Sequence, residues 1–166
     1  YSSHPLLGCV EIDHSWYKPP TAEQYRDYAQ QVPQGFTLLA KSFRDITLPG
    51  SDRFLNPDYF RQHCLQPFLN GLGDKAGPLL IAFQAGSING DSASFLQRLG
   101  EFISDIPAEE RQQAHLTLEI REPGLLSGRH APHYTRLLNE YQIAHCFIHH
   151  PSMPSIIEQA RALAAV

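Results

Sequence analysis

Apolar residues alternate with polar ones in some segments of this chain and recur every three or four positions in others. The first pattern is typical of strands and the second of amphipathic helices. The expected strands are residues 8–13, 36–41, 78–84, 114–121 and 143–150. The expected helices are residues 21–33, 56–73, 91–107, 131–142 and 154–166.

Local signals mark the limits of the first two helices. Thr21 and Gln24 have the spacing of a capping box, and Pro33 ends that segment. In the second helix, Asn56 is a suitable N-cap and Pro57 a suitable first residue. The chain thus reads as five β-α units in series, a pattern typical of a parallel sheet covered by helices.

Each expected strand has one apolar face and one mixed face, with the polar residues toward its carboxyl end. An open doubly wound sheet buries both faces, and the glycine-rich turns of nucleotide sites do not follow these strands. We therefore expect an α/β fold of the TIM (β/α)8-barrel type, here a partial barrel of about five units with parallel strands. The polar residues expected at its mouth are Glu11, Asp13, Lys41, Gln84, Glu119, Arg121 and His149.

Composition fits a single domain over residues 1–166, with 42% hydrophobic and 18% charged residues. The net charge of −4 disfavours nucleic-acid binding without excluding a local basic patch, and no apolar run is long enough to span a bilayer. Cys9, Cys64 and Cys146 are too widely spaced for a disulfide framework or a thiolate zinc site. We expect packed, reduced thiols and a cytoplasmic location, and predict no oligomeric state.

Charges of both signs inside one pocket are costly unless they are paired, so a ligand or chemistry explains them better than stability does. Glu11, Asp13 and Glu119 are the candidate catalytic acids and bases. The candidate substrate-binding residues are Tyr17, Lys41, Gln84, Arg121 and His149. We expect a small-molecule ligand, and the leading hypothesis is a hydrolase or lyase acting on a small polar or phosphorylated substrate, without a cofactor.

Three alternatives stay open. The charged residues can form purely structural ion pairs, or the pocket can belong to a non-catalytic module that binds a small anion or a nucleic acid. A metal-dependent enzyme resembling xylose-isomerase-like barrels would use Glu11, Asp13, Glu119 and His149 as ligands. Because Lys41 and Arg121 would crowd a cation there, surface histidines are the preferred interpretation and no metal site is predicted.

Four stretches resemble, in order and spacing, the domain of unknown function 72 family of YecE-like proteins: "VEIDHSWYKPP", "FTLLAKSFRDIT", "GPLLIAFQ" and "LTLEIREP". The resemblance covers essentially the whole chain and implies a TIM barrel without an established activity. The residues that it highlights are Glu11, Asp13, Ser15, Tyr17, Lys41, Glu119 and Arg121.

The chain also departs from the family pattern. Asp13 stands where the family usually has Asn, and "AFQA" replaces the usual QFP, which puts the amide at Gln84. A complete barrel of this type has around 250 residues. The resemblance therefore implies a fragment that lacks the first strand and the last two β-α units.

Overall fold

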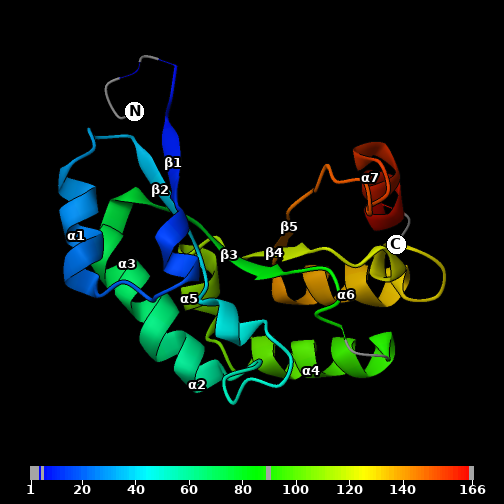
Figure 1. The fold of residues 1–166 in the computed structure, drawn as a ribbon. Coiled ribbons are helices and arrows are strands. Elements are labelled where there is room, and N and C mark those ends of the chain that lie inside the picture. The colour runs from blue at the N-terminus through cyan, green and yellow to red at the C-terminus, as the bar shows by residue number, and fades with distance from the viewer. Residues whose placement is uncertain (1–3, 5, 89–90, 165–166) are drawn as a thin grey trace.

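The computed structural model of the chain describes residues 4, 6–88 and 91–164. Within these residues, five strands form one sheet in which every neighbouring pair is parallel, in the order β1-β2-β3-β4-β5. The strands are β1 (Cys9–Ile12), β2 (Thr37–Lys41), β3 (Ala76–Phe83), β4 (Thr117–Ile120) and β5 (Ala144–His145). β1 and β5 are the outer strands, so the sheet is open (Figure 1).

Helices connect successive strands, and one more follows the last strand; together they lie around one side of the curved sheet (Figure 1). They are α1 (Ala22–Gln30), α2 (Pro57–Phe60), α3 (Gln66–Leu72), α4 (Ser92–Ser104), α5 (Ala108–Gln113), α6 (Ala131–Tyr141) and α7 (Ile156–Ala164). Sequential parallel strands with helical crossovers confirm the predicted α/β class, and the arrangement is consistent with part of a TIM-like barrel. In the part of the chain described here, no helix is both long and apolar enough to cross a membrane.

The predicted helix starts are confirmed at atomic level. Thr21 Oγ1 accepts a hydrogen bond from the Gln24 backbone N–H at 3.2 Å, and Gln24 Oε1 accepts one from the Thr21 N–H at 2.9 Å. These two bonds are the reciprocal pair of a capping box. Asn56 Oδ1 likewise accepts from the Tyr59 N–H at 2.9 Å. The last expected helix is present as α7, while residues 165–166 lie outside the described residues.

Several segments differ from the sequence prediction. The fourth strand, expected over residues 114–121, spans only Thr117–Ile120, and in the expected helix 56–73 a π-helical turn, Arg61–Leu65, separates α2 from α3. Helix α5 was not expected, because its sequence AEERQQ is polar and has no apolar stripe to reveal it. The fifth strand was expected over residues 143–150 but spans only Ala144–His145. Its one neighbour in the sheet is β4, which itself has only four residues, so little backbone is available for pairing.

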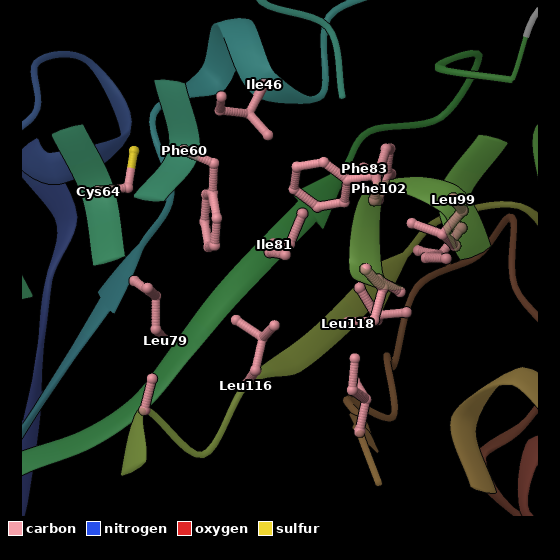
Figure 2. Packing of buried hydrophobic residues seen from close by; sticks show 14 of the residues in the cluster. Ile46, Phe60, Cys64, Leu79, Ile81, Phe83, Leu99, Phe102, Leu116 and Leu118 are labelled. Atoms are coloured by element: carbon pink, nitrogen blue, oxygen red, sulfur yellow. The ribbon is translucent and has the colours of Figure 1, made fainter. Parts of the chain in front are cut away.

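The core lies between the helices and one face of the sheet (Figure 2). The strands contribute alternate residues to it, among them Leu38, Leu79, Ile81 and Leu118, as the predicted apolar face requires. Helices α1 and α3 approach each other closely at Gly71, where an added Cβ would lie 2.3 Å from the Cβ of Tyr25. The core therefore fixes the orientation of the sheet, and the opposite face is left for polar residues.

Candidate functional site

A cavity of about 600 Å³ opens on the polar face of the sheet, at the carboxyl ends of β1 to β4. It is lined by Asp13, Trp16, Tyr17, Lys41, Gln84 and Arg121. Lys41 is the last residue of β2, while Asp13, Gln84 and Arg121 directly follow β1, β3 and β4. Because parallel strands end at the same edge of the sheet, side chains far apart in the sequence meet here.

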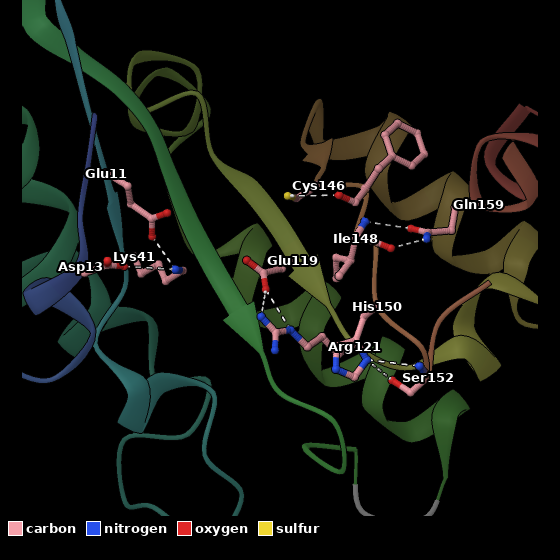
Figure 3. A network of polar contacts seen from close by, with 11 residues as sticks. Glu11, Asp13, Lys41, Glu119, Arg121, Cys146, Ile148, His150, Ser152 and Gln159 are labelled. Atoms are coloured by element: carbon pink, nitrogen blue, oxygen red, sulfur yellow. Dashed lines mark hydrogen bonds and ion pairs between the residues drawn. The ribbon is translucent and has the colours of Figure 1, made fainter. Parts of the chain in front are cut away.

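Lys41 is held by carboxylates from β1 and from the turn after it (Figure 3). Its Nζ lies 2.5 Å from Oε1 of Glu11 and 3.6 Å from Oδ1 of Asp13. Burial alone would lower the pKa of Lys41, but the hydrogen bond and charge of Glu11, with the charges of Glu119 and Asp13, outweigh it and raise the pKa. Lys41 is therefore a cation at neutral pH.

Ser15 ties the segment that carries the aromatic residues to β2. It lies in a short 3-10 helix, η1 (Asp13–Trp16), and its side chain is buried. The Ser15 hydroxyl donates to the Ile12 carbonyl at 2.7 Å and accepts from the Lys41 backbone N–H at 3.1 Å. One hydroxyl thus fixes the position of Trp16, the next residue, relative to Lys41.

A second carboxylate–cation pair lies at the carboxyl end of β4 (Figure 3). Nη2 and Nε of Arg121 donate to the same oxygen, Oε1 of Glu119, at 2.9 and 3.1 Å. The Glu119 side chain is only 9% exposed, whereas that of Arg121 is 32% exposed. Arg121 is part of the cavity wall, whereas Glu119 is not. Both hydrogen bonds from Arg121 use Oε1 of Glu119, so Oε2 takes no part in this contact.

The structure brings most of the predicted site residues together. Asp13, Tyr17, Lys41, Gln84 and Arg121 line the one cavity, and Glu11 and Glu119 contact its two cations. His149 is exposed, follows the end of β5 by four residues, and is not part of the cavity wall. Trp16 also lines the cavity, and the signal for it was its position directly after the first strand.

The predicted inward face of the fifth strand is wrong by one residue. His145 pairs with Leu118, which points to the core, and its Nδ1 lies 2.9 Å from the Tyr134 hydroxyl on α6. Cys146 donates its backbone N–H to the Leu118 carbonyl and so lies beside Glu119. A shift of one residue exchanges the two faces of a strand.

The thiols also differ from expectation, apart from Cys64. Cys64 is buried in the core as predicted, and burial raises its pKa to about 12. Cys9 was expected to be a core thiol but is exposed on the outer strand β1. Cys146 is half-buried on the polar side, where burial and the charges of Glu119 and Glu11 raise its pKa.

The described residues contain no group of three His, Cys, Asp or Glu side chains placed to hold a metal ion. In the cavity, the expected carboxylate ligands contact Lys41 and Arg121 instead. His130 and His133 line a separate cavity of about 510 Å³ between α4 and α6. No observation in the described part of the chain therefore favours the metal-dependent alternative.

Comparison with known proteins agrees with the fold. Two crystal structures of a DUF72 family protein from Enterococcus faecalis V583, at 3.10 and 2.52 Å resolution, superpose with TM-scores of 0.66 and 0.65. Each is 18% identical in sequence, and they match 89% and 90% of this chain. The match covers 52% and 59% of those longer chains, so this chain spans little more than half their length.

No curated protein matches the sequence. A family model does: the one described as "Protein of unknown function DUF72" matches residues 1–165, which is nearly the whole chain. This match agrees with the resemblance carried by the stretches around Glu11, Lys41 and Glu119. The chain belongs to the DUF72 family.

Proposed function

We propose that the cavity binds a small polar molecule and performs acid–base chemistry on it, as a hydrolase or lyase does. The observation that carries this proposal is the pair of carboxylate–cation contacts facing one cavity, Glu11 with Lys41 and Glu119 with Arg121. Withdrawing a charged group from water costs roughly several kcal/mol for each ion, and pairing with an opposite charge offsets that cost. The mouth of a TIM-type barrel is where such a cost supports function.

The contacts suggest distinct roles for the carboxylates. Asp13 lines the cavity and its side chain is 82% exposed, so it contacts a bound molecule directly and is the first candidate for proton transfer. Glu119 is the second candidate for proton transfer, through its oxygen Oε2, because both hydrogen bonds from Arg121 go to Oε1. Glu11 is a positioning residue, because it holds Lys41 toward the cavity.

The cavity also supports substrate binding independently of catalysis. Gln84 offers both an amide N–H and a carbonyl oxygen, and Tyr17 stands at the rim with 68% of its surface exposed. An exposed aromatic side chain beside polar groups is a common feature of ligand sites. These two residues can orient a substrate without taking part in proton transfer.

The test is a screen of the purified chain against p-nitrophenyl esters, glycosides and phosphates, which report bond cleavage by colour. Activity found in this screen is expected to fall by at least about a hundredfold in Asp13→Asn or in Glu119→Gln, the size of a general acid–base contribution. Asp45→Asn is the matched control, since Asp45 pairs with Arg53 away from the cavity. Full activity in both cavity variants would contradict the assignment.

Binding measured in the same variants separates an enzyme from a non-catalytic module. An enzyme loses turnover in Glu119→Gln while its ligand affinity stays nearly constant, because the change removes the group that can exchange a proton and keeps almost the same volume. A binding module shows saturable ligand binding and no turnover for any member of the screen. Calorimetric titration of the wild-type chain and the two variants distinguishes these outcomes.

A further inference from the structure

We infer that the ligand of this cavity is a neutral, hydroxyl-rich molecule of the carbohydrate or polyol class. This inference rests on the proposed function, because it names the substrate class of the same site. The sequence left a polar substrate, a phosphorylated substrate and a small anion open, and for the last two Lys41 and Arg121 would be the binding groups. The contacts of these two cations point to a different chemistry.

Charge balance is the first argument. The site contains three carboxylates, Glu11, Asp13 and Glu119, and two cations, Lys41 and Arg121. Both cations are already engaged by carboxylates at ion-pair distance, so the site holds one more negative than positive group. A phosphate would add negative charge to this excess, and like charges close together in a partly buried site repel each other.

The hydrogen-bonding character of the wall is the second argument. A hydroxyl group both donates and accepts, so a polyhydroxylated ligand needs donors and acceptors side by side. Lys41 and Arg121 supply N–H donors, Asp13 supplies acceptor oxygens, and Gln84 supplies both. Such an alternating wall satisfies hydroxyls, whereas a phosphate or carboxylate group would face acceptors that it cannot pair with.

The aromatic residues are the third argument. Trp16 and Tyr17 are consecutive residues at the end of the 3-10 helix after β1, and both line the cavity. Flat aromatic rings offer apolar faces that pack against the C–H groups of a sugar ring, while their polar tips stay in water. The cavity volume of about 600 Å³ lies in the range usual for small-molecule sites, roughly 300–1,000 Å³.

The chain contains a single tryptophan, and it is Trp16. Intrinsic tryptophan fluorescence therefore reports on this cavity alone. We would titrate the full chain with glucose, xylose, cellobiose and glycerol, and in parallel with inorganic phosphate and glucose 6-phosphate, at low and at physiological salt. The expected result is a saturable change with at least one neutral sugar or polyol that is insensitive to salt.

Three variants test whether the aromatic wall and the excess negative charge determine what binds. Tyr17→Ala is expected to weaken sugar binding by about 2- to 10-fold, the usual size of an aromatic contact. Leu48→Ala, which removes a 51% exposed side chain outside the cavity wall, should leave it unchanged. Asp13→Asn removes the excess negative charge, so it should reduce sugar affinity and improve phosphate affinity.

The outcomes distinguish this inference from the function on which it rests. Saturation by phosphate or glucose 6-phosphate alone, weakened by salt, would overturn the neutral-ligand assignment and leave the proposed site standing. If no probe saturates either the fluorescence or a calorimetric titration, both the ligand class and the site are wrong. Sugar binding that is equal in Tyr17→Ala and wild type would place the ligand elsewhere and also overturn the inference.

Discussion

Arg121 folds back onto Glu119, two residues earlier in the chain, and gives two N–H donors to the single oxygen Oε1. Removing Arg121 leaves a nearly buried carboxylate without its partner. We expect Arg121→Met to lower the free energy of unfolding by about 2 kcal/mol, below the range for fully buried pairs because Arg121 is partly exposed. Urea denaturation measures this directly.

The double variant Glu119→Gln with Arg121→Met should recover most of that loss, since no charge is then left unpaired. Arg44→Met is the control: its guanidinium is 3.7 Å from Asp45 and 55% exposed, so its cost should stay below about 1 kcal/mol. A double variant no more stable than Arg121→Met alone would show that the pair is not the source of the effect.

Two helical glycines make a matched pair for packing. At Gly71 an added Cβ would lie 2.3 Å from the Tyr25 Cβ and 2.6 Å from the Ala22 carbonyl oxygen, so Gly71→Ala should cost about 1–3 kcal/mol. At Gly100 it would meet only Leu137 Cδ1, at 3.7 Å, so Gly100→Ala should gain about 0.5–1 kcal/mol from helix propensity. Thermal unfolding should place Gly71→Ala below wild type and Gly100→Ala above it. A Gly71→Ala variant as stable as wild type would refute the close contact.

His145 should make stability depend on pH. Its burial lowers its pKa, and the nearby Gln159 side chain offsets this only in part. The unfolded chain therefore takes up a proton at His145, near its ordinary pKa of about 6.5, before the folded chain does. Stability is therefore fully present above about pH 7 and is lost as the pH falls from there toward the lowered pKa of the folded state.

Urea midpoints between about pH 8 and pH 5 test this dependence. We expect a shallower loss of stability in His145→Asn than in wild type. His149→Asn is the control, since His149 is an exposed histidine of the same segment. Equal slopes in wild type and His145→Asn would assign the pH dependence to other groups.

The three thiols should react at clearly separated rates, because the thiolate is the reactive form and must be accessible. Cys9 is exposed and should react first with a disulfide reagent such as DTNB. Cys146 should follow slowly, and Cys64, with its pKa raised to about 12, should react only after unfolding. Peptide mass spectrometry identifies each site, and a fast phase that persists in Cys9→Ser would contradict this order.

Strand alternation predicted the architecture well, because each strand here buries one face against helices. The apolar residues Leu79 and Ile81 predicted that face, and the polar residues Lys41 and Arg121 predicted which strand ends meet at the cavity. Helix caps such as Thr21 were predicted equally well, since a cap bonds only to residues of the next helical turn. These features depend on neighbours within a few positions in the sequence.

Features that depend on residues distant in the sequence could not be predicted from local patterns. By sequence Cys146 shares the apolar face of the fifth strand with Ala144 and Ile148, and only its pairing with β4 shows that it lies on the cavity side. The pairing of Lys41 with Glu11 rather than with a ligand likewise depends on the register of β1 and β2. Exposure of Cys9 follows from its place on an outer strand, which no local pattern encodes.

The Ser15 hydroxyl gives the cavity a mechanical property. Because it bonds both the Ile12 carbonyl and the Lys41 backbone, the aromatic wall and the cation are parts of one rigid frame rather than independent groups. A molecule bound in the cavity could displace Trp16 only by straining the link to β2, so a ligand of the proposed site would have to fit the existing shape. Pre-organisation of this kind lowers the entropic cost of binding and makes recognition depend on shape as much as on charge.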